Sequence, residues 1–164
     1  MDDTLSIAHI YTIFSQKSDL VYRFVSLQNE YYAIPRDYGT GAFLTMVEST
    51  TLKSIEGSPG ITVTELAHAG RRTKGAVSQV VKKLEQRGYV FRKRCPADGK
   101  RALLHVTDKG KRLNSKYRTC DMRDMQIMLE KLLEDCTIAE ADAFFKVLHA
   151  YTALLEEEVV KRGR

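Results

Sequence analysis

The feature that most limits how this chain can fold is a change of hydrophobic period at Gly88. Before Gly88, apolar residues in segment 73–87 recur every three or four positions, which is the spacing of one helix face. After it, segments 89–94 and 101–106 alternate with a period near two, on either side of the turn-forming Pro96-Ala97-Asp98-Gly99. The sequence therefore predicts a helix that runs directly into a β-hairpin.

Helical spacing, interrupted by turn residues, accounts for the remainder of the chain. Segment 5–32 is apolar at helical spacing and stops before Pro35, and a second helical segment covers 44–55. After the hairpin, a long helical segment at 108–136 is followed by a last helix. The expected fold is a single domain, 1–164, of mainly α (α+β) class with the order α-α-α-α-β-β-α-α.

A short extended stretch at 61–63 leads into two helices joined by a tight turn, and the first of them is expected to end at Gly70. A helix pair of this kind followed by a hairpin is a winged helix-turn-helix, whose second helix enters the major groove of DNA. We expect this winged-helix region at 44–106. Because threonine hydroxyls satisfy free N–H groups at helix starts, the expected N-caps are Thr64, Thr73, Thr107 and Thr137.

The second helix of the pair has two distinct faces. Its apolar residues fall on one stripe, and its polar residues share the opposite side, where they are free to meet DNA. An ordinary amphipathic helix with a solvated polar face is the alternative. Val77, Val80, Val81 and Leu84 form the stripe, and Lys74, Gly75, Ser78, Gln79 and Lys82 form the polar face.

The charge of the chain is concentrated in its middle. The whole sequence has 26 Lys and Arg against 21 Asp and Glu, a net charge of +5. Segment 61–118 holds 16 of these basic residues and 4 of the acidic ones, a local +12, which leaves −7 for the two flanks. A segment this basic has the electrostatics of a polyanion binder, although charge alone leaves a solvated Lys-rich face as the alternative.

Several segments of the basic region resemble the MarR-type winged-helix transcriptional regulators. The resemblance implies a protein without enzymatic activity that binds double-stranded DNA as a homodimer and regulates transcription, most often as a repressor. The resembling segments are Ile61-Thr62-Val63-Thr64-Glu65-Leu66-Ala67, Thr73-Lys74-Gly75-Ala76-Val77-Ser78-Gln79, Lys82-Lys83-Leu84-Glu85 and Val106-Thr107-Asp108-Lys109-Gly110.

Two positions depart from the family pattern. The wing tip usually carries an Arg that enters the minor groove, whereas here Lys100 holds that position and Arg101 follows it, so which of the two cations takes the role stays open. In the turn of the helix pair, Gly70-Arg71 stands where relatives often have an apolar residue and then Gly. The predicted DNA contacts are Arg71, Arg72, Thr73, Lys74, Gly75, Ser78, Gln79, Lys82, Arg92, Arg94, Lys100 and Arg101.

The flanking helices, at 5–34 and 108–161, carry more apolar surface than a winged-helix region needs. The resemblance implies that they interdigitate in a homodimer; a larger monomeric core is the alternative. The predicted interface residues are Ile7, Ile10, Phe14, Phe144, Phe145, Leu148, Tyr151 and Leu155.

The resemblance also implies a small aromatic or phenolic acid as effector, bound between the dimer helices and the winged-helix region. Oxidation sensing is a rival trigger, for which Cys95 beside Arg94 is the candidate. The expected lining of the effector cleft is Tyr11, Tyr31, Tyr32 and Tyr38, although aromatic residues at helical spacing are more often plain core.

Other classes of function have little support in the sequence. Its four histidines show no HExxH or paired Cys/His spacing, and no GxSxG, P-loop or GxGxxG occurs, so we expect no enzyme, metal or cofactor. The chain has no run of 18 apolar residues and starts with Met1-Asp2-Asp3, which favours a cytoplasmic protein without membrane contact. The alternative function is a winged-helix module whose basic face docks an acidic protein partner or RNA.

Overall fold

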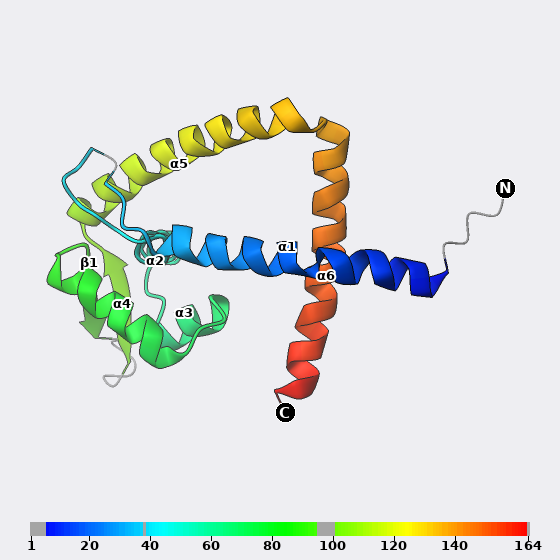
Figure 1. Cartoon of the computed structure of the whole chain (residues 1–164). Helices are drawn as coiled ribbons and strands as arrows, with labels where there is room; N and C mark the ends of the chain where they lie inside the picture. The colour runs from blue at the N-terminus through cyan, green and yellow to red at the C-terminus, as the bar shows by residue number, and fades with distance from the viewer. Residues whose placement is uncertain (1–5, 38, 95–100, 164) are drawn as a thin grey trace. The chain divides into compact units, whose positions relative to one another are not determined.

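The structure, a computed structural model, describes residues 6–37, 39–94 and 101–163. It divides into two compact units, Met1–Arg118 and Thr119–Arg164. The order of elements confirms the predicted fold class (Figure 1). They are α1 Ile7–Ala33, α2 Met46–Gly57, α3 Val63–Ala69, α4 Lys74–Gln86, β1 Val90–Arg94, β2 Ala102–Val106, α5 Asp108–Asp135 and α6 Ile138–Arg162. Across the described residues, no helix combines the length and hydrophobicity that crossing a membrane requires.

Threonine caps begin most of these helices. The Thr73 and Thr137 hydroxyls accept hydrogen bonds from Ala76 N and Glu140 N, and the Thr107 hydroxyl accepts one from Gly110 N, which confirms these three predicted caps. Thr45 caps α2, so that helix begins at Met46 and not at 44.

The predicted cap of α3 is wrong. The N-cap is Thr62, not Thr64, and the helix begins at Val63. Thr62 is the cap because Glu65 lies three positions after it. The Thr62 hydroxyl accepts a hydrogen bond from Glu65 N, and the Glu65 carboxylate accepts one from Thr62 N at 2.8 Å. This reciprocal capping box satisfies two free N–H groups at once, which Thr64 cannot do.

The core of the first unit lies between α2, α4 and the wing. Its most deeply buried side chains come from the loop before α2, from α2, from α4 and from β2, and the stripe on α4 supplies three buried residues with Val80 half-buried beside them. Burial of the stripe turns the polar face of α4 toward solvent. The fully buried large side chains are Leu44, Leu52, Ile55, Val81, Leu84 and Leu104.

The wing is an antiparallel pair whose free end points away from the core. Val90 pairs with Val106 at its base and Arg94 with Ala102 at the far end, before the tip residues 95–100, which lie outside the described part. The predicted extended stretch before α3 borders the other edge of β2, because Gly60 N donates to Leu104 O and Leu104 N donates to Ile61 O. β2 is therefore paired on both sides, with β1 along one edge and with Gly60 and Ile61 at Leu104 along the other.

The start of α5 is pressed against the base of the wing. A Cβ atom at Gly110 would collide with the carbonyl oxygen of Tyr89 and with the Val106 side chain, so only glycine fits there. Thr107 completes the junction, since its hydroxyl donates to Gly88 O at 2.7 Å and its N–H donates to Tyr89 O at 3.0 Å. The end of α4, the base of the wing and the first turn of α5 thus form one tightly packed junction.

The loop between α1 and α2 is fixed from several sides. Arg36 and Leu44 exchange backbone hydrogen bonds across it, and the Tyr117 hydroxyl on α5 donates to Arg36 O at 2.6 Å and accepts from Leu44 N at 3.0 Å. Within the loop, Asp37 accepts from Thr40 N and from Gly41 N. The loop therefore has a defined conformation where the structure describes it.

The second unit consists of the last part of α5 and all of α6. Among its described residues none is buried in the single chain, although many are large and apolar. Phe144 and Phe145 pack edge to face with ring centroids 5.5 Å apart, yet each keeps more than half of its side chain exposed. Such a helix pair has not covered its own apolar surface.

Candidate nucleic-acid interface

The outward face of α4 is a polar and largely exposed surface of the helix-turn-helix. Lys74, Gly75, Gln79 and Lys82 are exposed, and Ser78 is half-buried. Apart from the neighbouring residues and the helix's own backbone, no atom of the described residues lies within 4 Å of where a Cβ at Gly75 would sit, so this part of the helix surface is open. The structure brings these predicted contacts together on one face of α4, from Lys74 at its first turn to Lys82.

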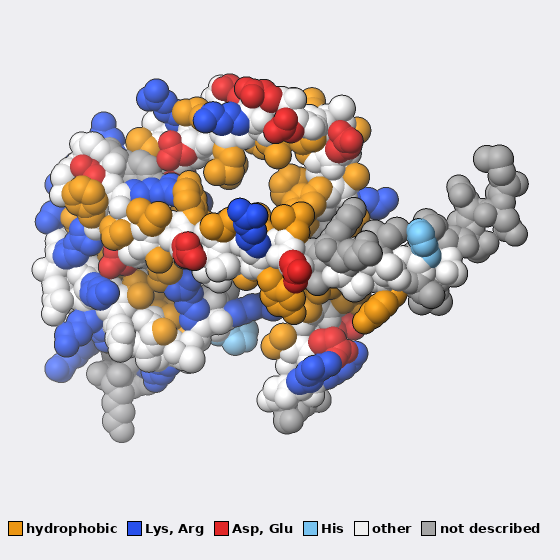
Figure 2. Space-filling view, viewed as in Figure 1, with side chains coloured by type: hydrophobic (Ala, Val, Ile, Leu, Met, Phe, Trp, Pro, Cys, Tyr) orange, Lys and Arg blue, Asp and Glu red, His pale blue; other side chains and the backbone are white. Residues whose placement is uncertain are grey.

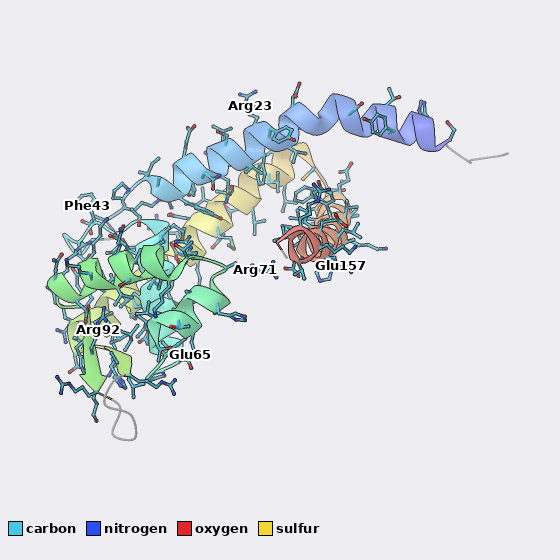
Figure 3. The ribbon with its side chains drawn as sticks, turned by 90° about the horizontal axis from the view of Figure 1, so that it is seen from below. Arg23, Phe43, Glu65, Arg71, Arg92 and Glu157 are labelled. Carbon is cyan, nitrogen blue, oxygen red and sulfur yellow. The ribbon has the colours of Figure 1, made fainter. Side chains whose placement is uncertain are left out.

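The turn between α3 and α4 has an unusual backbone. Arg71 has a φ of 49°, in the left-handed region, whereas Gly70, which caps α3, has a φ of −88°. Arg72 N donates to Ala67 O at 2.9 Å and closes the turn. Arg71, which Figure 3 labels, and Arg72 are both exposed in the turn that leads into α4.

Two of the predicted wing contacts are already engaged with carboxylates. Arg92 on β1 binds Glu85 on α4, with Nε 2.9 Å from the carboxylate, and Arg101 beside β2 lies 3.5 Å from the Glu65 carboxylate on α3. Figure 3 labels Arg92 and Glu65 on these elements. A guanidinium has five N–H donors, so each arginine can hold its carboxylate and still bind phosphate.

Glu65 therefore has two functions. It completes the cap of α3, and it anchors the arginine that follows the wing tip. Its hydrogen bond from Thr62 N is the main reason that its pKa is lowered; the Thr62 hydroxyl adds to this, and the nearby Arg101 charge contributes less. Glu65 is consequently ionised at neutral pH and available to attract Arg101.

Sequence reasoning missed both carboxylates, Glu65 and Glu85. The spacing Thr62-x-x-Glu65 was a signal for the cap, but nothing local connects Glu65 to Arg101, which follows 36 positions later. Glu85 precedes Arg92 by seven positions across a turn and a change of secondary structure, so only the fold places the two together.

The electrostatic character of this region is cationic. Lys and Arg side chains gather over α4 and the wing on the visible face (Figure 2). Arg94 is exposed at the end of β1, near the tip, while Lys100 lies outside the described residues. The arrangement can bind a polyanion by charge and can present Ser and Gln side chains to hydrogen-bonding edges.

Of the tyrosines predicted to line an effector cleft, the three that the structure describes are spread along α1. Tyr31 and Tyr32 are neighbours with ring centroids 6.1 Å apart, and the Arg36 guanidinium lies 3.8 Å from the Tyr31 ring centre. Tyr11 lies twenty residues earlier on the same helix, about 30 Å away at 1.5 Å per residue. Tyr38 lies outside the described residues.

The predicted dimer residues divide between the two units. Phe144, Phe145, Leu148, Tyr151 and Leu155 are all exposed on α6. Ile7, Ile10 and Phe14 belong to α1, but their side chains are outside what the structure describes.

The remaining candidates for chemistry are metal-binding side chains and cysteine thiols. The described residues contain no cluster of three His, Cys, Asp or Glu side chains that could hold a metal ion. Cys120 and Cys136 are half-buried free thiols, and Cys95 lies outside the described residues.

Comparison with solved structures shows the same fold in DNA- and ligand-bound proteins. FabT of Streptococcus pneumoniae, solved in complex with DNA, has 22% identity and a TM-score of 0.63 over 90% of this chain and 98% of its own. The PcaV transcriptional regulator of Streptomyces coelicolor, solved with its natural ligand, has 20% identity and a TM-score of 0.56 over 93% of this chain and 96% of its own. MarR has 27% identity and a TM-score of 0.53 over 72% of this chain and 80% of its own. No curated protein matches the chain.

The buried stripe and open polar face of α4, together with the basic wing packed beside it, define a winged helix-turn-helix protein. The family model of the MarR family matches residues 44–101, which span α2 to the start of β2. Over these residues the sequence matches the MarR family, and the fold of the chain is similar to that of MarR.

Proposed function

We propose that this protein is a sequence-specific transcriptional repressor that reads duplex DNA as a homodimer and releases it when a small aromatic effector binds. The observation that carries the proposal is the outward face of α4, where exposed Lys74, Gln79 and Lys82 share one side of the helix with half-buried Ser78. The faces of α4 match those of a recognition helix, with apolar residues packed inward and polar residues free to meet base edges.

The proposed reading mode assigns a separate task to each part of the interface. Ser78 and Gln79 read base edges in the major groove, while Arg71, Arg72 and Lys82 bind phosphates on either side. The wing brings Arg92, Arg94, Lys100 and Arg101 toward the neighbouring backbone or minor groove.

The proposed homodimer is supported by the apolar surface of the second unit. An isolated chain would expose Phe144, Phe145, Leu148, Tyr151 and Leu155 together, and contiguous apolar surface of this kind marks an interface. Two copies related by a two-fold axis would present two recognition helices to half-sites about 34 Å apart.

The proposed effector is supported by the likeness to PcaV, which was solved with its natural ligand. An effector relieves repression only if it binds the form that cannot hold DNA more tightly than the form that can. Tyr31 and Tyr32, close together on α1, are the part of the predicted lining that the fold keeps adjacent.

The test is binding of the purified protein to DNA from upstream of its own gene and to a scrambled duplex, at two salt concentrations. We expect a preference for the upstream DNA and a log–log salt slope of about −0.9 for each phosphate contacted. Binding that is indifferent to sequence, or a stronger preference for single-stranded RNA, would favour the alternative of a docking module.

A pair of variants on α4 tests the reading face. Gln79→Ala should reduce discrimination between the two duplexes by about 1–3 kcal/mol if Gln79 reads a base. Gln86→Ala is the matched control, because Gln86 is an exposed glutamine at the other end of the same helix. If Gln79→Ala leaves the discrimination unchanged, the assignment of this face is wrong.

A further inference from the structure

A cationic surface covers the first turns of α5, beside the loop that precedes α2. Segment 109–118 holds five Lys and Arg residues and no Asp or Glu. Two of the five, Arg112 and Lys116, line an open pocket of about 450 Å³ together with Ala42 of the loop. Phe43, the next residue of the loop (labelled in Figure 3), is 59% exposed. We call Ala42, Phe43, Arg112 and Lys116 the loop–α5 surface.

This surface does not belong to the proposed DNA interface. The first turns of α5 adjoin the base of the wing, where Val90 pairs with Val106, whereas the tip follows Arg94 at the opposite end of the strands. In Figure 1 the far ends of the two strands point away from the first turns of α5. The loop–α5 surface would therefore stay accessible while the wing tip contacts DNA.

The two cations of the surface have no partner in the part of the chain that the structure describes. Arg112 and Lys116 are exposed, and neither forms a hydrogen bond or an ion pair with a described residue. Lys109, by contrast, is held in place, because its Nζ donates to Arg87 O at 2.9 Å. Arg112 and Lys116 are four positions apart on one helix face, so their like charges repel each other until an acidic group lies between them.

The backbone on both sides of the surface is fixed. Phe43 O accepts a hydrogen bond from Arg87 Nη2 at 2.7 Å, and Leu44, the next residue, is fully buried. On α5, the neighbouring Leu113 and Tyr117 are buried in the core of the first unit. A surface that is already ordered loses little conformational entropy on binding, which favours affinity.

The composition of the surface favours a protein segment over a small molecule or DNA. The apolar residues Leu113 and Tyr89 of the pocket are only 4% and 5% exposed, so they offer a small apolar molecule little area. The phosphates of DNA gain nothing from an exposed aromatic ring such as Phe43. Aromatic and arginine side chains, by contrast, are the residues enriched at protein–protein hot spots.

From these features we propose that the loop–α5 surface docks an acidic segment of another protein. Carboxylates of the segment bind Arg112, whose parallel N–H donors match a carboxylate, and Lys116, which adds a second charge. An apolar side chain of the segment contacts Phe43. The inference goes beyond the proposed function and does not depend on it, because the surface lies apart from α4 and the wing tip and can be tested without DNA.

The test measures the fluorescence anisotropy of a labelled peptide mixed with the intact protein. The probe is a short fluorescein-labelled peptide of Glu residues with a central pair of Leu residues, and the comparison peptide has Gln in place of each Glu. We expect saturable binding of the acidic peptide, at least about tenfold tighter than that of the Gln peptide. Arg112→Gln combined with Lys116→Gln should raise the Kd of the acidic peptide at least about fivefold, and Phe43→Ala at least about threefold.

The matched control removes the same number of positive charges from α4. Lys74→Gln combined with Lys82→Gln should weaken the binding of duplex DNA on the proposed function, while the Kd of the acidic peptide stays within about twofold. We expect this separation at about 0.15 M salt, where exposed charges more than about 8 Å apart are largely screened. The Arg112 and Lys116 double variant should show the reverse, with its affinity for duplex DNA within about twofold of the original.

Any of four results would overturn the proposal. The first is absence of saturable binding, or equal affinity for the Gln peptide, which would remove the acidic partner. The second is an equal Kd for the Arg112 and Lys116 double variant and the original protein, which would place the peptide elsewhere. The third is an equal loss in the α4 double variant, which would reduce the attraction to net charge. The fourth is an unchanged Kd in Phe43→Ala, which would remove the apolar contact.

The variants of this test should all fold, because every substituted side chain is exposed. A far-UV circular dichroism spectrum of each variant checks this before its Kd is compared.

Discussion

At the scale of single residues, Arg71 stands out because a left-handed backbone is costly for any residue with a Cβ. Its φ of 49° is the one positive value for a non-glycine residue in the described chain. Gly70, the residue before it, has an ordinary φ of −88°. The glycine, which could adopt a left-handed backbone without strain, therefore lies one residue before the position that needs it.

Arg71→Gly should therefore raise the free energy of unfolding by about 0.5 kcal/mol, since relief of the strain slightly exceeds the added freedom of the unfolded chain. Urea unfolding measures it. Arg72→Gly, at a position without positive φ, should be neutral or destabilising. A loss of stability in Arg71→Gly larger than in Arg72→Gly would show that the contacts of the Arg71 side chain outweigh the strain.

Residues whose role is set by near neighbours could be predicted from the sequence, and residues whose role depends on distant partners could not. Thr73, Gly70 and the apolar stripe of α4 follow from short spacings and were correct. The prediction of Thr64 is wrong because Glu65 lies three positions after Thr62, and its side chain selects Thr62 over Thr64 as the cap. The pairing of Glu85 with Arg92 needs the angle between α4 and the wing, which no local pattern contains.

At the scale of elements, the same capping device recurs at the starts of α2, α3 and α6. In α3 and α6 the acidic member has a lowered pKa, mainly because the backbone N–H of the capping threonine donates to the carboxylate. A carboxyl group with a depressed pKa in the folded state stabilises that state fully above its unfolded pKa and loses this contribution as the pH falls through the folded pKa.

The stability of the protein should consequently decline as the pH falls from about 5 to about 3, around and below the ordinary Glu pKa of about 4.3. Urea unfolding at a series of pH values measures the decline. Glu140→Gln keeps a hydrogen-bond acceptor but removes the titration, so its stability should depend less on pH in this range. A pH profile identical to that of the original protein would contradict this account of the cap.

The junction between the wing and α5 should tolerate no side chain at Gly110. Gly110→Ala should lower the free energy of unfolding by about 1–3 kcal/mol, because the added methyl group meets Tyr89 O and the Val106 side chain. Gly75→Ala is the matched control in an open helical position, and it should raise stability by up to about 1 kcal/mol. Thermal or urea unfolding of both variants compares them, and equal effects would argue against the tight junction.

At the scale of the whole molecule, the apolar surface of α6 predicts the oligomeric state. Light scattering should give about 37 kDa, twice the chain mass of 18.6 kDa. Leu148→Glu should shift the mass toward that of one chain at micromolar concentration, because burying a carboxylate at the interface is unfavourable. Lys146→Glu, about 200° around the same helix, should leave the dimer intact. A Leu148→Glu protein that keeps the double mass would place the interface elsewhere.

The two carboxylates that hold Arg92 and Arg101 also bear on how a regulator finds its site in a chromosome. A genome offers about 10⁶–10⁹ competing non-specific sites, and cationic side chains bind all of them through phosphate. Glu65 and Glu85 reduce the attraction of the wing for any phosphate that approaches without good geometry. On the proposed function, these glutamates leave less of the protein trapped on irrelevant DNA, so that fewer molecules per cell suffice to occupy the operator.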